Sequence, residues 1–415
     1  MVPNRWDVRP LADIALITSG GTPSRAKPEF WQNGTIPWIR TTEVQNCILT
    51  PDDIQEYISE EGLKGSSAKL VPSGTVLLAM IGQGKTRGQV ALLKFEATIN
   101  QNCAAIIFNN DQEPYFHFNF LLSQYETIRS MSNSAGQSNL NGALVKTIKV
   151  PVPPLAEQKK IAKILSAWDK AIEITEKLLL NSQQQKKSLM QKLLTGKKRL
   201  LDKNGRRFNS EWKSCRLGDI GEIKSAGVDK KIVEGEVPVR LLNFTDVFKK
   251  TFIFADEINH WVSAPYSKVD GCNVLKGDVF FTPSSETREE VGMSAVVAAD
   301  IDSCCYSYHI VRFRIKENWD LNFKAFAFST PTFRKQVSLL ADGSGQRYVV
   351  SQDGFRSVMI SYPPIEEQRE IGKVLRLAEE ETMILDKKLN LLKQEKKALM
   401  QQLLTGKRRV KTEVA

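Results

Sequence analysis

The residues closest to a recognisable chemical motif are Ala79-Met80-Ile81-Gly82-Gln83-Gly84-Lys85-Thr86, which nearly match a P-loop. In a P-loop, backbone amides and a lysine bind nucleotide phosphates between a strand and a helix. Here Ala79 replaces the first glycine, and residues 87–93 are typical of a turn and a strand rather than a helix. Residues 283–288, at the equivalent place in the second half of the chain, read Pro-Ser-Ser-Glu-Thr-Arg. Nucleotide binding through Lys85 is therefore the weaker interpretation.

The same loop suits the reading of DNA, because Gln, Lys, Thr and Arg side chains donate hydrogen bonds to base edges and phosphates. Comparable polar residues lie in or beside other loops rich in Gly, Ser and Pro. In the first half of the chain the candidate DNA contacts are Arg25, Arg40, Gln83, Lys85, Thr86, Arg87, Gln137 and Asn139. In the second half they are Arg240, Asn243, Thr282, Ser284, Ser285, Arg288, Gln346 and Arg347. Any one of them could be a turn former or an ordinary surface charge, so the prediction concerns the loops as sets.

Other catalytic patterns are missing from the sequence. There is no methyltransferase [DN]PP[FY] motif, no nuclease cluster of the D…ExK kind, no HExxH and no CxxC. We therefore expect no catalytic residue and no metal site. The chain starts without an apolar signal segment and has no apolar run of membrane-spanning length, and its six cysteines are irregularly spaced. These features predict a reduced, cytoplasmic protein.

The elements that must position these loops include a duplicated segment. Residues 151–199 and 361–409 align at an offset of 210 without a gap, and 22 of the 49 aligned positions are identical. Each copy opens with Pro-Pro, which suits the first turn of a helix, and closes with Leu-Leu-Thr-Gly-Lys, whose glycine suits a helix end. A repeat of this length makes the chain a tandem of two similar halves.

A heptad pattern runs through both copies and predicts a coiled coil. The two halves of the chain should pack these helices on each other within the chain, in an antiparallel pair. The expected core positions are Ile161, Leu165, Trp168, Ile172, Thr175, Leu179, Ser182, Lys186, Leu189 and Leu193, and then Ile371, Leu375, Ala378, Thr382, Leu385, Leu389, Leu392, Lys396, Leu399 and Leu403. Lys186 and Lys396 interrupt the pattern at the same place. They could fix the register as buried polar residues, or the pair of helices could open there and leave them solvated.

Two globular blocks flank the first helix, which gives four segments. We expect a first domain over 1–150, a central helix over 151–199, a second domain over 200–360 with a basic linker at its start, and a C-terminal helix over 361–409. Short apolar runs bounded by turn residues predict strands at 75–81, 104–108, 278–282 and 309–315, and helices are expected near 115–131 and 321–340. The predicted fold class is α+β, with two strand-rich domains separated by two long antiparallel helices and related by a pseudo-two-fold axis.

The arrangement resembles the specificity subunit of type I restriction–modification systems. The residues that carry the resemblance are the helix openings Pro153-Pro154-Leu155-x-Glu157-Gln158 and Pro363-Pro364-Ile365-x-Glu367-Gln368 and the helix endings at 194–197 and 404–407. Residues 30–38 (FWQNGTIPW) and Gly345-Gln346 also look like parts of a family recognition domain.

This resemblance implies two target recognition domains, each reading one half of a bipartite site in double-stranded DNA. It also implies that the helices set the spacing and dock two methyltransferase subunits, which restriction/translocase subunits then join. No cofactor is expected on this chain, whereas S-adenosylmethionine and ATP are expected on those partners.

Two other classes of protein stay open from the residues alone. One is a coiled-coil scaffold that binds only protein, and the other is a nucleotide-dependent DNA enzyme that uses Gly82–Thr86. The net charge of +11 fits a nucleic-acid partner, but it also fits a simple solvated surface.

Overall fold

The structure is a computed structural model that describes residues 3–82, 84–134 and 139–412. The chain divides into two compact units. The first comprises 1–176 and 388–415, and the second comprises 177–387. Each unit therefore contains one globular domain, a stretch of one long helix and a stretch of the other. The candidates Gln83 and Gln137 lie outside the described residues.

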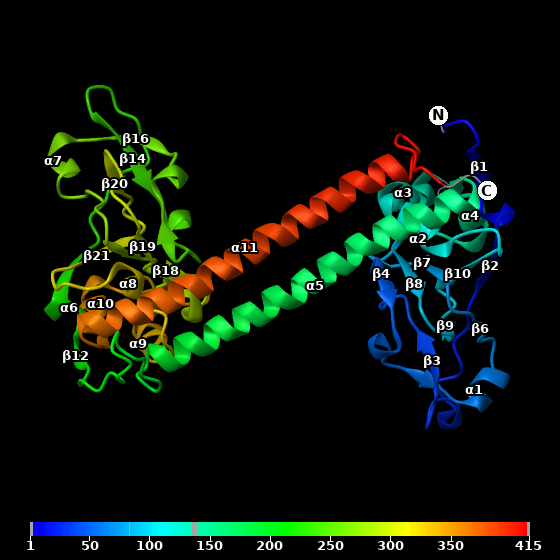
Figure 1. Cartoon of the computed structure of the whole chain (residues 1–415), viewed down its shortest axis with the longest axis horizontal. Helices are drawn as coiled ribbons and strands as arrows, with labels where there is room; N and C mark the ends of the chain where they lie inside the picture. The colour runs from blue at the N-terminus through cyan, green and yellow to red at the C-terminus, as the bar shows by residue number, and fades with distance from the viewer. Residues whose placement is uncertain (1–2, 83, 135–138, 413–415) are drawn as a thin grey trace. The chain divides into compact units, whose positions relative to one another are not determined.

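The domain of the first unit is built on a five-stranded sheet of order β2-β10-β7-β8-β4, in which only the β4–β8 pair is parallel. Figure 1 shows β7, β8 and β10 side by side. The strands of this sheet are β2 (Ala15–Ser19), β10 (Cys103–Phe108), β7 (Val76–Ala79), β8 (Val90–Leu93) and β4 (Cys47–Leu49). A second sheet of order β5-β3-β9-β6 consists of Tyr57–Ile58, Ile36–Ile39, Ala97–Ile99 and Leu70–Val71. The helices are α1 (Glu60–Lys64), α2 (Pro114–Ser123), α3 (Tyr125–Ser134) and α4 (Gly142–Thr147), with 3-10 turns η1 (Leu11–Asp13), η2 (Pro28–Phe30) and η3 (Pro51–Asp53).

The domain of the second unit repeats this plan. Its five-stranded sheet has the order β13-β21-β17-β19-β15, which corresponds strand for strand to the first unit's sheet. These strands are Gly221–Lys224, Val311–Ile315, Val279–Phe281, Ser294–Val297 and Phe252–Ile253. The other sheets are β16 (Trp261–Ala264), β14 (Val237–Leu242) and β20 (Cys304–Tyr306), and β18 (Ser284–Ser285), β23 (Arg347–Val349) and β22 (Asp342–Ser344). Its helices are α6 (Leu217–Ile220), α7 (Tyr266–Val269), α8 (Leu321–Ala327), α9 (Pro331–Leu340) and α10 (Gln352–Ser357), with η4 (Phe244–Asp246), η5 (Ala255–Glu257) and η6 (Arg288–Glu290).

A two-stranded sheet closes each domain onto the helix that follows it. In the first unit β1 (Asp7–Pro10) pairs with β11 (Lys149–Val152), and in the second β12 (Lys213–Arg216) pairs with β24 (Met359–Tyr362). The first strand of each domain therefore lies beside the strand that leads into the long helix. The four predicted strands and both predicted helical stretches are confirmed, with each helical stretch divided into two helices.

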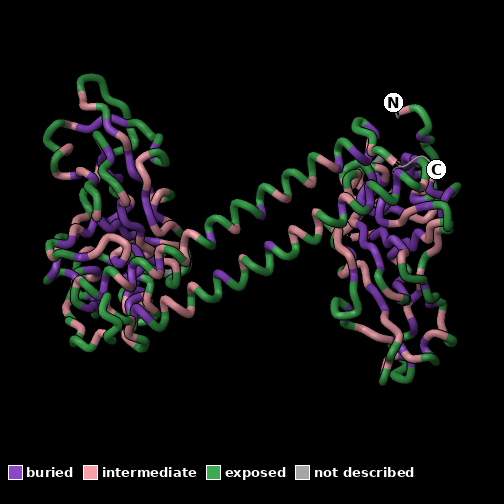
Figure 2. Tube along the Cα trace, viewed as in Figure 1, coloured by how far each residue is buried: buried purple, intermediate pink, exposed green. Residues whose placement is uncertain are grey.

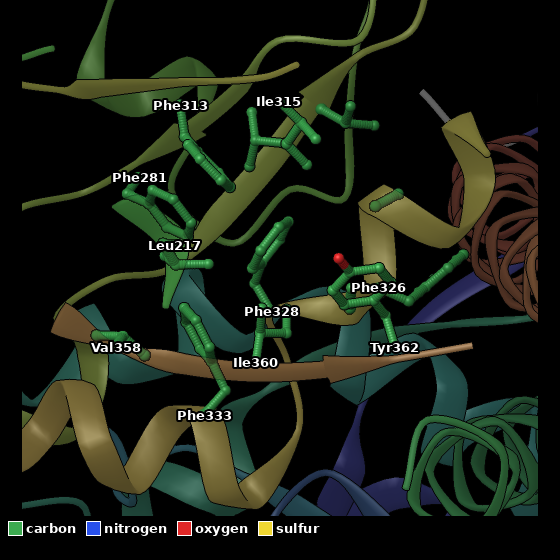
Figure 3. Close-up of a cluster of buried hydrophobic side chains, with 14 of the residues drawn as sticks. Leu217, Phe281, Phe313, Ile315, Phe326, Phe328, Phe333, Val358, Ile360 and Tyr362 are labelled. Carbon is green, nitrogen blue, oxygen red and sulfur yellow. The ribbon is translucent and has the colours of Figure 1, made fainter. Parts of the chain in front are cut away.

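Apolar side chains hold each sheet against its helices. In the second unit, Phe281, Phe313, Phe328 and Phe333 point toward one another in one buried cluster (Figure 3). The rings of Phe281 and Phe328 meet edge to face with centroids 5.3 Å apart, a favoured aromatic geometry.

The two long helices are α5 (Leu155–Leu193) and α11 (Ile365–Leu403), of 39 residues each. They begin directly after the Pro-Pro pairs, and Gly196 and Gly406 follow them with φ of +69° and +72°, as expected at helix ends. At 1.5 Å per residue each is roughly 60 Å long.

Ion pairs show that the helices run antiparallel within each unit. In the first unit Lys396 Nζ lies 2.5 Å from Asp169, and Lys393 Nζ lies 2.7 Å from Glu176. From the first of these pairs to the second, the residue number rises from 169 to 176 on α5 and falls from 396 to 393 on α11, so the helices are antiparallel. In the second unit Lys186 Nζ lies 2.5 Å from Glu379. Lys186 and Lys396 are thus paired rather than solvated, and the register-fixing interpretation is the one that the structure supports.

The predicted heptad positions fall into three groups. Near the division between the units, Thr175, Ser182, Thr382 and Leu389 are buried as the heptad frame requires. The end positions differ from the prediction, because they enter the domain cores as well as facing the other helix: Ile161, Leu165 and Leu403 belong to the first core, and Leu193, Ile371 and Leu375 to the second. The remaining apolar positions, Trp168, Ile172, Leu179, Leu189, Ala378, Leu385, Leu392 and Leu399, are half-buried.

Candidate nucleic-acid interface

The glutamates of the Pro-Pro motifs fasten each domain to both helices. In the second unit, Arg199 Nε donates to Glu367 Oε1 over 2.6 Å, and Trp212 Nε1 donates to Glu367 Oε2 over 3.3 Å. In the first unit, Arg409 Nε donates to Glu157 Oε2 over 2.8 Å, and Trp6 Nε1 donates to the same oxygen over 3.2 Å. The opening of one helix is therefore bound by the residue that follows the end of the other.

The glutamines next to these glutamates hold the loop before a domain helix. Gln158 Nε2 donates to the carbonyl of Pro153, while its Oε1 accepts from the backbone N–H of Glu113 at the start of α2. Gln368 makes the same two bonds, to Pro363 and from Asp320. The PPxEQ motif is thus structural, because its side chains hold the globular domain to the long helices.

A second acidic residue on each helix receives one bond from the domain and one from the other helix. Asp169 accepts from the Tyr115 hydroxyl as well as from Lys396. Glu379 accepts from Thr251 Oγ1 over 3.0 Å as well as from Lys186. Both units therefore carry a second fastening point whose helix residues lie at an offset of 210, whereas the domain donors, Tyr115 and Thr251, are not equivalent positions.

The near-P-loop of the first unit is the connection of a β-hairpin. The strand that follows it, β8, pairs antiparallel with β7, so no helix N-terminus stands where a phosphate would bind. Lys85 is exposed and Thr86 and Arg87 are half-buried. Asn139 is exposed, and its neighbour Leu140 donates its N–H to Met80 O over 2.9 Å. The candidates from 85–87 and from 139 thus lie on segments that flank the same strand end.

The second unit brings its candidates together in the same way. Ser284 and Ser285 form β18, which pairs with Tyr348 and Val349 of β23, and Arg347 Nη2 donates to Ser284 Oγ over 2.9 Å. The Arg288 guanidinium lies 4.9 Å from the centre of the Tyr348 ring. Arg288, Gln346 and Arg347 are exposed.

A cavity of about 560 Å³ lies beside these residues. It combines an aromatic wall with donors and acceptors, and its lining is Phe244, Phe248, Ser284, Ser285, Glu286, Glu290, His309, Gln346 and Arg347. The rings of Phe244 and Phe248 are stacked with centroids 5.3 Å apart. Burial lowers the pKa of His309, and the charges of Lys230 and Arg347 lower it further. His309 is therefore neutral at pH 7, and the charged groups of the cavity wall are Arg347, Glu286 and Glu290.

Phe244, Phe248 and His309 were not predicted, although Phe244 directly follows the candidate Asn243. They lie far in sequence from residues 284–286 and 346–347, which line the same cavity. The first unit also has a cleft, of about 570 Å³, at its loops. Its polar lining contains further unpredicted residues, namely Gln101, Asn102, Asn141 and Lys146.

Several candidates are buried or already bonded within the protein, among them Ser284, which is buried and accepts from Arg347. Thr282 is fully buried and its hydroxyl accepts from Met293 N over 3.1 Å, so direct contact with DNA is wrong for this residue. Asn243 is buried and donates to Leu241 O over 2.9 Å, which also contradicts the prediction. Arg240 donates to Ala255 O over 3.1 Å.

The two arginines near the start of the chain form a separate ionic cluster. Arg40 binds Glu43 over 2.6 Å and Glu56 over 2.7 Å. Arg25 also pairs with Glu56 and stacks 3.5 Å above the centre of the Trp31 ring. Both carboxylates would compete with a phosphate for these guanidinium groups. Arg25 and Arg40 are therefore weaker candidates for DNA contact than the exposed loop residues.

Over the described ranges, no group of three or more His, Cys, Asp or Glu side chains is placed to hold a metal ion. No helix among the described residues is long and apolar enough to cross a bilayer. The six cysteines are free thiols, and burial is the main cause that raises the pKa of each, which disfavours the reactive thiolate.

Comparisons with known proteins agree over nearly the whole chain. Residues 3–181 and 209–394 match the family described as the type I restriction modification DNA specificity domain. A putative type I restriction enzyme MjaX specificity subunit from Methanocaldococcus jannaschii is 27% identical over 99% of this chain and 95% of that protein. The EcoR124I/EcoR124II specificity subunit of Escherichia coli is 32% identical, but over 38% of this chain and 40% of that subunit.

A solved structure supports the fold. The S subunit of a type I restriction–modification system from M. genitalium has a TM-score of 0.59 at 16% identity, covering 97% of this chain and 98% of that one.

Proposed function

Because this chain belongs to the family of type I restriction–modification DNA specificity subunits, which recognise DNA sequence, we propose that each unit reads one half of a bipartite target. The observation that supports one half-site for each unit is that the two domains share the same plan. The same sheet order brings the loop after the third sheet strand beside the segment that precedes the long helix in both units.

The two sets of reading residues differ in chemistry while their scaffold stays the same. The first set offers Lys85, Thr86 and Asn139, and the second offers Ser285, Gln346 and Arg347. Arginine favours guanine and glutamine or asparagine favours adenine in the major groove. Different donors on one scaffold therefore give two different half-sites.

The helices supply the spacing and a docking surface in this proposal. We infer a coiled coil with pseudo-two-fold symmetry, because the ion pairs and the Glu–Arg contacts repeat at an offset of 210. Exposed residues run along both helices (Figure 2). Some of them are apolar, and of these Ile174 and Ile384 occupy equivalent positions. The others are Leu178, Leu180, Leu377, Met383 and Leu391. Exposed apolar patches mark protein interfaces. Two methyltransferase subunits would dock there, and restriction/translocase subunits would join that core.

The subunit itself would be non-catalytic and would work in the cytoplasm, with S-adenosylmethionine and ATP bound by its partners. A hairpin in place of a P-loop supports this proposal over a nucleotide-dependent enzyme. A gel shift of the chain with and without a methyltransferase subunit, together with an ATP titration, distinguishes a DNA reader from a protein scaffold or an ATPase.

One variant in each unit tests whether each unit reads its own half-site. Arg347→Ala should relax discrimination only in the half-site read by the second unit, by about 1–3 kcal/mol if it contacts a base. Lys85→Ala should act only on the other half. Selection from a duplex library with randomised positions gives both half-site preferences, and Lys335→Ala, an exposed lysine on α9, serves as the control. Loss of specificity in both halves from one substitution would contradict the two-reader proposal.

A further inference from the structure

In both units an arginine on a domain helix reaches the backbone of the reading loop. In the first unit, Arg129 of α3 donates through Nη1 to the carbonyl of Arg87 over 3.4 Å and to the Tyr125 hydroxyl over 3.0 Å. The Tyr125 hydroxyl in turn donates to the carbonyl of Lys85 over 2.6 Å. Two loop carbonyls are therefore held from one helix.

The second unit holds its loop in the corresponding way. Arg334 of α9 donates through Nη2 to the carbonyl of Glu289, within the loop that carries Ser285 and Arg288. In the first unit the order along the chain is β10, α2, α3, and in the second it is β21, α8, α9. Because β10 and β21 hold the same place in the two five-stranded sheets, the two arginines come from equivalent helices. Burial lowers the pKa of Arg334, and its Nη1 is buried without a partner, so this side chain is enclosed by protein rather than offered to DNA.

A glycine at the end of each loop makes the close approach possible. Gly88 has a φ of +89° and Gly292 a φ of +71°, and both donate their N–H to the strand before the loop, to Ala79 O and Thr282 O. A Cβ on Gly88 would lie 3.4 Å from Cα of Arg129, and a Cβ on Gly292 would lie 2.5 Å from Cγ1 of Val337 on α9. Each loop is therefore seated directly on the helix that carries its arginine.

We propose that Arg129, together with Tyr125, and Arg334 are positioning residues that set the two DNA-reading loops without touching DNA. The inference rests on the proposed function of the loops as readers. A carbonyl is present whatever the side chain, so a bond to the backbone fixes the loop while leaving its side chains free to differ between units. A reader must place donors to within about 0.5 Å, and a fixed backbone supplies that precision.

Paired substitutions test the positioning role in the full-length chain. Arg334→Met keeps much of the aliphatic volume and removes the donors, and it should reduce discrimination in the second half-site by about tenfold or more, the range of one bidentate base contact. The first half-site should be unchanged. Arg129→Met should do the reverse. Arg334→Lys retains a donor and should restore part of the discrimination, whereas Lys335→Met on the same helix is the matched control for loss of charge.

Tyr125→Phe removes a single hydroxyl and covers the case in which an arginine variant folds poorly. It should weaken discrimination in the first half-site with little change in melting temperature. The measurements are selection from the randomised duplex library, affinity for a non-cognate duplex, and hydrogen exchange of residues 84–90 and 285–292.

The outcomes separate three cases. A selective loss in one half-site with unchanged non-cognate affinity supports positioning. A uniform loss of affinity for all duplexes would mean that the arginine contacts phosphate. Unchanged discrimination in both Tyr125→Phe and Arg334→Met would mean that the loops do not depend on these bonds. Either result overturns the inference. If the wild-type chain, with a methyltransferase subunit, selects no bipartite sequence, the proposed function fails instead.

Discussion

At the scale of single residues, the least replaceable groups are those that fasten domains to helices. The side chain of Glu367 is 1% exposed, and its charge is matched by Arg199 and the indole N–H of Trp212. A buried carboxylate that loses its cation remains buried as an unpaired charge. Removing one partner therefore lowers the free energy of unfolding by more than the intact pair contributes to it.

Arg199→Met should therefore destabilise the second unit by about 2–4 kcal/mol, and the double variant Arg199→Met/Glu367→Gln should lose less than the sum of the single changes. Urea denaturation measures the free energies of unfolding. Additive losses would show that the two side chains are not energetically coupled.

His117 gives the first unit a pH dependence. It is fully buried against Phe108, and burial lowers its pKa to about 3, against the opposing effect of a hydrogen bond with Gln158. The folded pKa lies below the unfolded value of about 6.5, so the unfolded state binds the proton first. Stability is complete above pH 6.5 and should fall by about 1.4 kcal/mol per pH unit as the pH drops toward 3.

Hydrogen exchange of peptides from α2 between pH 4.5 and 7.5, corrected for intrinsic exchange, measures this slope. His117→Gln should flatten it, because glutamine does not titrate. An equal slope in the variant would assign the pH dependence to other groups.

At the scale of elements, the helix pair is the proposed spacer, and charged pairs join its two helices in each unit. Lys186–Glu379 and Lys396–Asp169 have the same geometry in the two units, so an insertion in one helix alone would break the register on one side. Inserting seven residues after Leu180 and seven after Ile384 keeps the heptad frame and adds roughly 10 Å to each helix.

The preferred gap between half-sites should then grow by about three base pairs, at 3.4 Å per pair, while both half-sites stay the same. Selection from libraries with variable gaps measures the change. The insertion after Leu180 alone is the control, and it should destabilise the pair without giving a new defined gap. An unchanged gap in the double insertion would show that the helices do not set the spacing.

At the scale of the whole molecule, the repeat means that two copies of one half can make the contacts that the two different halves make in the full chain. Arg199 binds Glu367 as Arg409 binds Glu157, and Lys186 binds Glu379 as Lys396 binds Asp169. A fragment of residues 1–205 carries Arg199, Lys186, Glu157 and Asp169, so two copies can form both contacts twice.

This fragment should form an isologous two-fold dimer, the commonest closed symmetry. The dimer should read a symmetric site: the first half-site, a gap and its inverted repeat. Light scattering gives the mass, and methylation by a methyltransferase subunit gives the sequence. A folded monomer, or methylation of the asymmetric site alone, would show that the two helices are not interchangeable.

The sequence by itself determined the features that depend on local periodicity. The Pro-Pro openings and Thr-Gly endings bounded α5 and α11, and the heptad frame placed Thr175 and Thr382 in the buried stripe. The repeat indicated two similar domains, and the Gly/Ser-rich loops indicated segments that the fold brings side by side, residue 80 with residue 140 and residues 284–285 with 348–349. These features follow from neighbours within a turn or a strand, which sequence spacing encodes directly.

Only the tertiary structure decided which polar residues are free to bind. Thr282 and Arg40 are donors of the right kind in the right sort of loop, yet one is buried and the other is tied to two carboxylates. The contact between Arg409 and Glu157 joins residues 252 positions apart, and Phe244 meets Arg347 in one cavity. Such groupings depend on how strands pair and which loop each sheet edge brings close, and no local pattern in the chain records them.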